Sequence, residues 1–213
     1  MRQGMVIDLE RCIGCHACEV ACEFENGTPP GIAWTRVFMR EDGGFPDTRR
    51  FFMPTLCMHC KHPACVEVCP TGASYQREDG VVLVDHDKCI GCKACMIACP
   101  YDARYFDEGG DYPGMPALTE RPGGESNKLI GTVEKCTFCV HRLEKGEEPV
   151  CVIVCPTVAR VFGDLDNPES AVSRLIKERH GFQIHEELGR EPSVYYLSAK
   201  SIMLESSPQK DRV

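Results

Sequence analysis

The feature that most constrains this chain is the arrangement of its 16 cysteines in four groups of four, with none left over. The first group (Cys12, Cys15, Cys18 and Cys22) and the third (Cys89, Cys92, Cys95 and Cys99) share the spacing C-x2-C-x2-C-x3-C. The second group (Cys57, Cys60, Cys65 and Cys69) and the fourth (Cys136, Cys139, Cys151 and Cys155) keep its two outer pairs and lengthen the gap between them. Any fold of these 213 residues must therefore serve four sites built from sulfur.

The repeated spacing is that of iron–sulfur proteins of the bacterial ferredoxin type. Three thiolates close together in the sequence fit three corners of a [4Fe–4S] cluster, and the fourth thiolate binds a different cluster. Such motifs must come in pairs, so four motifs predict four [4Fe–4S] clusters. The longer gaps in the second and fourth groups cost little, because loop-closure entropy grows only logarithmically with length.

Disulfides and zinc are the two alternatives. Eight disulfides would need an oxidising compartment, yet no secretory leader is visible before Cys12 and the close spacings disfavour internal bridges. Zinc sites also use C-x2-C pairs, but one tetrahedral ion does not need three closely spaced thiolates. Zinc also leaves unexplained the proline that follows the last cysteine of three groups, at Pro70, Pro100 and Pro156.

An internal repeat indicates how the groups pair. The phrases "MVIDLERC" and "VVLVDHDKC" lead into the first and third groups in the same way, as a strand, an acidic turn and a cysteine. The second and third groups are close together in the chain, which leaves the first to pair with the fourth. We therefore predict an α+β fold of two nested ferredoxin-like modules with long loops. The inner module would span 57–106, and the outer module 1–56 plus 132–162.

The remaining segments are predicted to be loops and a tail. An insert loop occupies 107–131, and 26–49 is expected to be surface loop with a short strand near Trp34 to Met39. The C-terminal tail, 163–213, has no cysteine and is predicted to make subunit contacts. It is expected to contain an amphipathic helix capped by Asn167 and a short strand in "PSVYYLSAK".

Charge and hydropathy limit the partners. A net charge of −8 argues against nucleic acid, and no apolar run approaches the ~18 residues of a membrane-spanning helix. Four histidines near the cysteines are expected to have a loop or hydrogen-bonding role and not to be ligands, because 16 thiolates already fill 16 cluster positions: His16, His59, His62 and His141. Three lysines there would either raise cluster potentials or be solvated surface charges: Lys61, Lys93 and Lys135.

Taken together, these motifs resemble a known family. The chain is similar to the four-cluster iron–sulfur subunits of the molybdopterin oxidoreductases of the dimethyl-sulfoxide reductase family, such as those of polysulfide, thiosulfate, tetrathionate and respiratory arsenate reductases. The likeness covers most of residues 5–170, through "MVIDLERCIGCHAC", "CMHCKHPACVEVCPTGA", "CIGCKACMIACPYDARY", "EKCTFCVHRLEKG" and "VCPTVARVFGDLDNPES".

The resemblance implies four ligand sets, which we name quartets. The first quartet is Cys12, Cys15, Cys18 and Cys155, and the second is Cys22, Cys136, Cys139 and Cys151. The third is Cys57, Cys60, Cys65 and Cys99, and the fourth is Cys69, Cys89, Cys92 and Cys95. Some relatives replace a cysteine of the third group and carry a [3Fe–4S] centre. This chain keeps all four, so four complete clusters are expected.

The resemblance also implies a role and a location. The chain would have no active site of its own and would relay electrons between a large molybdopterin subunit, holding molybdenum or tungsten, and a quinone-reactive membrane subunit in anaerobic respiration. A freely diffusing polyferredoxin is the alternative, against which the tail and the insert loop argue. The expected location is the periplasmic face of the cytoplasmic membrane, reached by folded export with a catalytic partner that carries a twin-arginine signal. A cytoplasmic location is the alternative.

Overall fold

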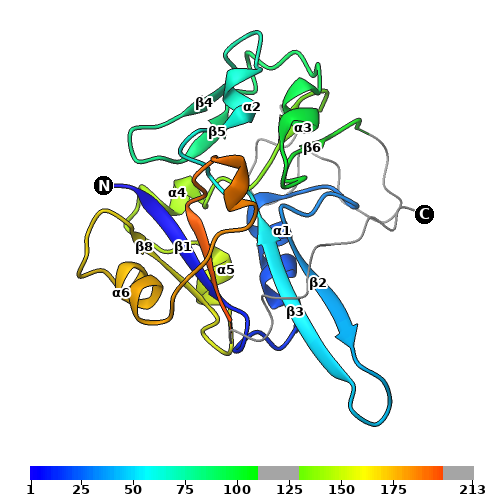
Figure 1. Ribbon diagram of the computed structural model, residues 1–213. Helices are drawn as coiled ribbons and strands as arrows, with labels where there is room; N and C mark the ends of the chain where they lie inside the picture. The colour runs from blue at the N-terminus through cyan, green and yellow to red at the C-terminus, as the bar shows by residue number, and fades with distance from the viewer. Residues whose placement is uncertain (110–129, 199–213) are drawn as a thin grey trace.

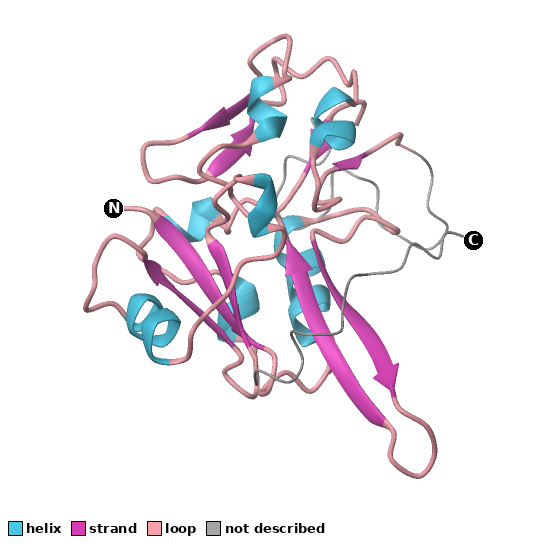
Figure 2. Ribbon diagram, in the orientation of Figure 1, coloured by secondary structure: helices cyan, strands magenta, loops and turns pink. Residues whose placement is uncertain are grey.

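The computed structural model describes residues 1–109 and 130–198 of the chain. Most of the insert loop predicted at 107–131 and the last part of the tail predicted at 163–213 lie outside the described residues. Short helices and several small sheets make up the described part, in a mixed α/β arrangement without one continuous sheet (Figures 1 and 2). The chain must therefore hold its parts together by something other than an extended strand ladder.

A three-stranded sheet brings the first and fourth cysteine groups together. Its central strand, β1 (Gln3–Asp8), pairs antiparallel with β8 (Arg160–Asp164) and parallel with β9 (Val194–Leu197). Strand β1 leads into the first cysteine group, and β8 follows the last cysteine of the fourth. Pairing of these two strands therefore holds the cysteine loops of the first and fourth groups side by side, although they are far apart in the sequence. The predicted strands at "MVIDLERC" and "PSVYYLSAK" are confirmed.

The second and third groups are joined in the same manner. Strand β4 (Ser74–Gln76) follows the second group and pairs antiparallel with β5 (Val82–Val84), which leads into the third and confirms the strand predicted there. A further two-stranded sheet, β6 (Tyr105–Phe106) with β7 (Val133–Glu134), connects this region to the start of the fourth group.

Helices carry the cysteines and pack in two pairs. Helix α1 (Ala17–Asn26) contacts α5 (Val150–Ile153), and α2 (Ala64–Glu67) contacts α3 (Ala94–Ala98). Helix α4 (Val140–Leu143) lies directly after Cys139. The first group thus packs against the fourth, and the second packs against the third.

A long hairpin projects from the body of the protein (Figure 1). Its strands are β2 (Thr35–Asp42) and β3 (Arg49–Leu56), which pair antiparallel along their whole length. The short strand expected near Trp34 to Met39 is the first part of β2. Strand β3 was not predicted from the sequence, and the remainder of 26–49 was expected to be surface loop.

The described part of the tail folds back onto the cluster-bearing region. It contains α6 (Ala171–Glu178), the 3-10 helix η3 (Glu186–Leu188) and β9. The amphipathic helix is confirmed, but its predicted cap is wrong. Ser170 caps α6 by accepting a hydrogen bond from the Ser173 amide, while Asn167 accepts from the Glu169 amide in the preceding turn. Asn167 therefore stabilises that turn, and the helix begins one turn later.

Candidate iron–sulfur cluster sites

Three cavities in the described residues are each lined by four cysteines from two separate parts of the chain. The first quartet lines one cavity (Cys12, Cys15, Cys18 and Cys155), the second quartet another (Cys22, Cys136, Cys139 and Cys151) and the fourth quartet another (Cys69, Cys89, Cys92 and Cys95). Their remaining walls are largely apolar or backbone. Each cavity takes three cysteines from one sequence group and one from its partner group.

The third quartet lies together in the same way. Burial, followed by the charges of Cys57, Cys65 and Cys99, raises the pKa of Cys60 to about 12. These four thiols therefore lie close enough together, away from water, to interact electrostatically. Within the described ranges no three ligating side chains could hold a single metal ion. Thiols that surround a cavity instead suit a cluster, in which each sulfur binds a different iron.

The two copies of C-I-G-C share one backbone conformation. The glycines Gly14 and Gly91 both have φ near +66°, a region that favours glycine. The residues before helices α1 and α3, His16 and Lys93, both adopt the left-handed conformation with φ of 58° and 62°. A repeated sequence thus folds into a repeated loop, which turns its thiols toward one cavity each.

Backbone amides favour the thiolate form of the last cysteine in the second and fourth groups. The amide of Ser74 donates to the sulfur of Cys69 at 3.4 Å, and the amide of Ala159 donates to the sulfur of Cys155 at 3.2 Å. Burial opposes the ionisation of Cys69, but hydrogen bonds from the Ser74 amide and from Thr71 and Ala73 outweigh it and lower the pKa of Cys69 to about 7. Burial instead raises the pKa of Cys136 far above the ordinary thiol range. Iron must supply the positive charge that ionises such a thiol.

The four histidines hold hydrogen bonds, as predicted. His16 and His141 bond the carboxylates of Glu19 and Glu25, each at 2.8 Å. His59 accepts from the Val82 amide at 3.0 Å and stacks on the ring of Phe138 at 3.7 Å. His62 faces Glu191 at 3.3 Å. The cysteines therefore remain the candidate ligands.

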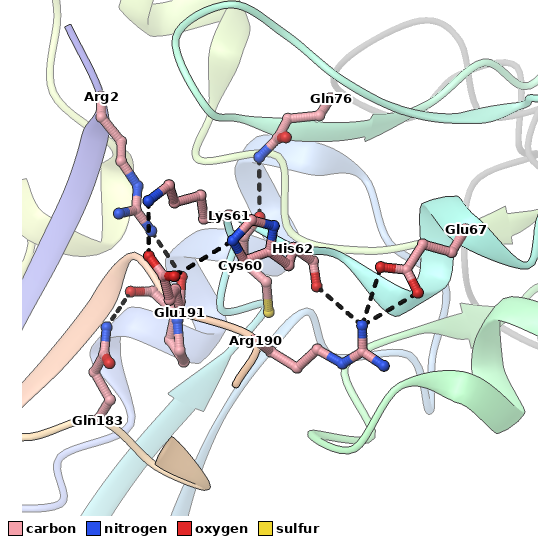
Figure 3. Close-up of polar contacts among 10 residues, drawn as sticks. Arg2, Cys60, Lys61, His62, Glu67, Gln76, Gln183, Arg190 and Glu191 are labelled. Carbon is pink, nitrogen blue, oxygen red and sulfur yellow. Dashed lines mark hydrogen bonds and ion pairs between the residues drawn. The ribbon is translucent and has the colours of Figure 1, made fainter. Parts of the chain in front are cut away.

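The three lysines, for which the sequence left open a surface role or an effect on cluster potentials, differ in burial. Lys61 is exposed and pairs with Glu191 at 2.9 Å, within the surface network of Figure 3 that ties the tail to the second cysteine loop. Lys93 is partly exposed, lies 3.9 Å above the ring of Phe106 and pairs with Glu108 at 3.5 Å. Lys135 is only 2% exposed. Of these three lysines, only Lys135 has its charge in the interior of the protein.

Two buried arginines near the cluster sites were not predicted from the sequence. Arg104 and Arg160 are 2% and 1% exposed, and both follow the last cysteine of a group in the phrase C-P-x-x-A-R, as "CPYDAR" and "CPTVAR". Arg160 donates to the sulfur of Cys18 at 3.4 Å and to the Thr35 hydroxyl at 2.9 Å. Arg104 donates to the Ser74 hydroxyl at 2.8 Å. The repeated phrase was the available signal.

Comparison with known proteins assigns the family. Residues 48–112 and 124–165 match a family model described as a 4Fe–4S dicluster domain, and residues 11–73 match a second model with the same description. A selenate reductase subunit of Mesobacillus selenatarsenatis is 45% identical over 207 residues, which cover 91% of this chain and 71% of that protein. The chain belongs to the iron–sulfur subunits of the dimethyl-sulfoxide reductase family of molybdoenzymes.

Other relatives are similar over most of their length. The iron–sulfur subunit of the arsenate respiratory reductase of Shewanella sp. (strain ANA-3) is 43% identical over 227 residues, covering 92% of this chain and 96% of that protein. A sulfite dehydrogenase subunit of Allochromatium vinosum is 40% identical over 229 residues, covering 97% of this chain and 87% of that protein.

Family membership confirms the predicted cofactor. Two dicluster domains and 16 cysteines account for four [4Fe–4S] clusters, so this iron–sulfur subunit is an electron-transfer protein. The disulfide and zinc alternatives are set aside. None of the helices in the described part of the chain has the length and apolar character needed to cross a bilayer.

Proposed function

We propose that this iron–sulfur subunit relays single electrons through four clusters in series, between a molybdopterin catalytic subunit and a quinone-reactive membrane subunit. The observation that carries the proposal is the contact between successive quartets. Each [4Fe–4S] cluster, when bound, accepts and releases one electron. A relay therefore needs neighbouring sites with no large gap between them.

The proposed ligands are the four quartets, arranged in two nested ferredoxin-like modules. The cavities described above support the first, second and fourth quartets, and the mutual effects on the pKa of Cys60 support the third. The packing of α1 on α5 and of α2 on α3 supports the nesting, with the second and third groups enclosed by the first and fourth.

Successive quartets meet through named cysteines. After burial, Cys57 of the third quartet contributes most to raising the pKa of Cys136 of the second. Cys151 of the second quartet likewise raises the pKa of Cys18 of the first. Cys65 and Cys95, of the third and fourth quartets, pack in one small core. Cys57 and Cys136, and likewise Cys18 and Cys151, also belong to one packed core. This proximity supports the order first, second, third, fourth.

The two end quartets are the natural points of entry and exit. Cys15 of the first quartet and Cys92 of the fourth are exposed, whereas every other ligand is at least partly buried. We place the first quartet toward the molybdopterin and the fourth toward the membrane subunit. Because the relatives are named for selenate, arsenate and sulfite, the substrate of the catalytic partner is proposed to be an oxyanion or a related sulfur compound.

Single-cysteine variants at the two ends test the relay. The complex is purified anaerobically with Cys15→Ser or Cys92→Ser, and cluster signals are followed after addition of a quinol analogue or of the oxyanion. With Cys15→Ser, quinol should still reduce the remaining clusters, but the oxyanion should no longer reoxidise them. Cys92→Ser should lose reduction by quinol instead. Exchange of the two results would reverse the orientation, and a chain that purifies alone without molybdenum would indicate a free carrier.

We also propose that the subunit reaches the periplasmic face of the membrane folded and bound to its catalytic partner. Cys12 and Cys155 line the same cavity although they are far apart in the sequence, so cluster insertion accompanies folding and, in this proposal, precedes transport. Fractionation of cells that lack the catalytic subunit tests this. The subunit should then remain in the cytoplasm. Its appearance in the periplasm would exclude transport as a passenger.

A further inference from the structure

Three cations, Arg160, Lys135 and Arg104, are buried in the described part of the chain without a carboxylate partner. Their exposed fractions are 1%, 2% and 2%, and none forms an ion pair with an Asp or Glu of the described residues. A buried charge is costly unless an opposite charge or several hydrogen bonds compensate it. The groups that compensate these three positive charges must therefore include the nearby cysteines.

Arg160 lies between the first and second quartets. Its guanidinium donates to Cys18 of the first quartet at 3.4 Å and lines the cavity of that quartet. The same guanidinium donates to the Thr35 hydroxyl at 2.9 Å, and Thr35 lines the cavity of the second quartet. One side chain thus reaches a ligand of the first cluster site and the wall of the second.

Arg104 occupies the matching place between the third and fourth quartets. It donates to Ser74, which lines the cavity of the fourth quartet. Cys65 of the third quartet and Cys95 of the fourth, which pack in one small core, both lie within range of its charge. The phrase C-P-x-x-A-R therefore delivers the same cation to the same position in each module.

Lys135 lies at the remaining step, between the second and third quartets. Its ammonium group donates to the carbonyl of Cys136 at 2.7 Å and also to the carbonyl of Val82, which belongs to β5 of the inner region. Val82 packs in one small core with Cys65 of the third quartet, and Cys136 is a ligand of the second quartet. This ammonium group therefore joins the two halves of the relay.

We propose that Arg160, Lys135 and Arg104 are positioning charges, one at each step of the relay, and that each raises the reduction potentials of the two clusters beside it. A fixed positive charge in a low-dielectric interior favours the reduced, more negative state of a cluster. Because each cation lies beside two clusters, it raises both potentials in the same direction and adds little to the difference between them. The inference rests on the ligand quartets proposed above.

The test replaces each cation by glutamine in the intact complex and follows all four clusters by redox titration with electron paramagnetic resonance. Arg160→Gln should lower the potentials of the first and second clusters only, Lys135→Gln those of the second and third, and Arg104→Gln those of the third and fourth. The expected change is at least tenfold in each reduction equilibrium, which is about 59 mV for one electron. Cys15→Ser and Cys92→Ser identify the signals of the end clusters.

Lys61→Gln is the matched control. Lys61 follows the ligand Cys60 directly but is exposed and paired with Glu191, so water and salt screen its charge. All four potentials should stay unchanged. Iron is measured in every variant, because a loss from about 16 atoms per chain reports on the quartets and not on the charges.

Conservative variants keep the proposal falsifiable if a glutamine variant fails to assemble. Arg160→Lys and Arg104→Lys retain the charge and should restore both the iron content and potentials near those of the native protein. Full iron content with four unchanged potentials in the glutamine variants would overturn the proposal. Failure of both the glutamine and the lysine variant at one position would also overturn it, in favour of a packing role.

Discussion

At the scale of single residues, Gly91 occupies a position that has no room for a side chain. Its φ is +66°, and an added Cβ would lie 2.4 Å from the backbone oxygen of Gly131. We predict that Gly91→Ala loses one cluster, about four iron atoms per chain. The loop of the third cysteine group can then no longer bring its three thiols of the fourth quartet next to Cys69. Iron analysis and the cluster signals measure the loss.

Gly31 provides the control for Gly91. It has a similar φ of +86°, but nothing lies within 4 Å of an added Cβ. Gly31→Ala should therefore keep all the iron, although it carries a comparable backbone cost of about 1–2 kcal/mol. Equal iron content in the two variants would contradict the steric explanation.

The ligand assignment makes a separate prediction at Cys155. Cys155→Ser should damage the cluster held with Cys12, Cys15 and Cys18, since their cavity also contains Cys155. The cluster of the second quartet should remain. Electron paramagnetic resonance of the reduced protein distinguishes the two signals, and Cys151→Ser should give the reverse pattern. Loss of the second cluster from Cys155→Ser would reverse the proposed pairing.

At the scale of elements, one hydrogen bond links the tail strand to the hairpin. The buried hydroxyl of Tyr196 on β9 donates to the Pro54 carbonyl on β3 at 2.9 Å. Tyr196→Phe leaves that carbonyl without its partner, and we predict a loss of about 1–3 kcal/mol in stability. This corresponds to roughly 2–4 °C in Tm for each kcal/mol in a chain of this size.

Thermal unfolding followed by circular dichroism measures this change, with iron content as a check. Tyr195→Phe is the matched control, because Tyr195 lies on the same strand and has no hydrogen-bond partner for its hydroxyl among the described residues. Its Tm should not change. An unchanged Tm for Tyr196→Phe would show that β9 and β3 are held by packing alone.

The elements also differ in how far they could be predicted. The strands β1, β5 and β9 were predicted from short runs of β-branched and apolar residues. Strand β3 was missed because Pro54 interrupts it, and proline normally argues against a strand interior. It is tolerated because β3 has only one neighbour, β2, and needs no hydrogen bond from Pro54 on its other side.

At the scale of the whole molecule, the core is built around the cluster sites. The largest group of packed buried residues includes Cys18, Cys22, Cys57, Cys136 and Cys151. We predict that the chain without iron is largely unfolded, because cluster binding supplies much of the free energy that closes distant segments on one another. Circular dichroism and protease sensitivity after anaerobic iron removal check this.

Reconstitution gives the converse result. Iron and sulfide added under reducing conditions should restore the native spectrum together with about 16 iron and 16 sulfide per chain. A compact, protease-resistant protein without iron would mean that the small sheets and β9 suffice to hold the fold.

The sequence by itself determined the chemistry of the clusters. Ligand spacing is local, so C-x2-C-x2-C-x3-C in the first and third groups, and the same motif with a longer middle gap in the second and fourth, specifies a cluster loop wherever the loop lies. Four such motifs specify four clusters. The tertiary structure alone decided which charges are buried and which quartets meet. Lys61 and Lys135 look alike in the sequence, but only Lys135 lies inside, because burial depends on packing between segments far apart in the chain. For the same reason the positions of Arg104 and Arg160 between quartets emerged only when β8 paired with β1 and β4 with β5.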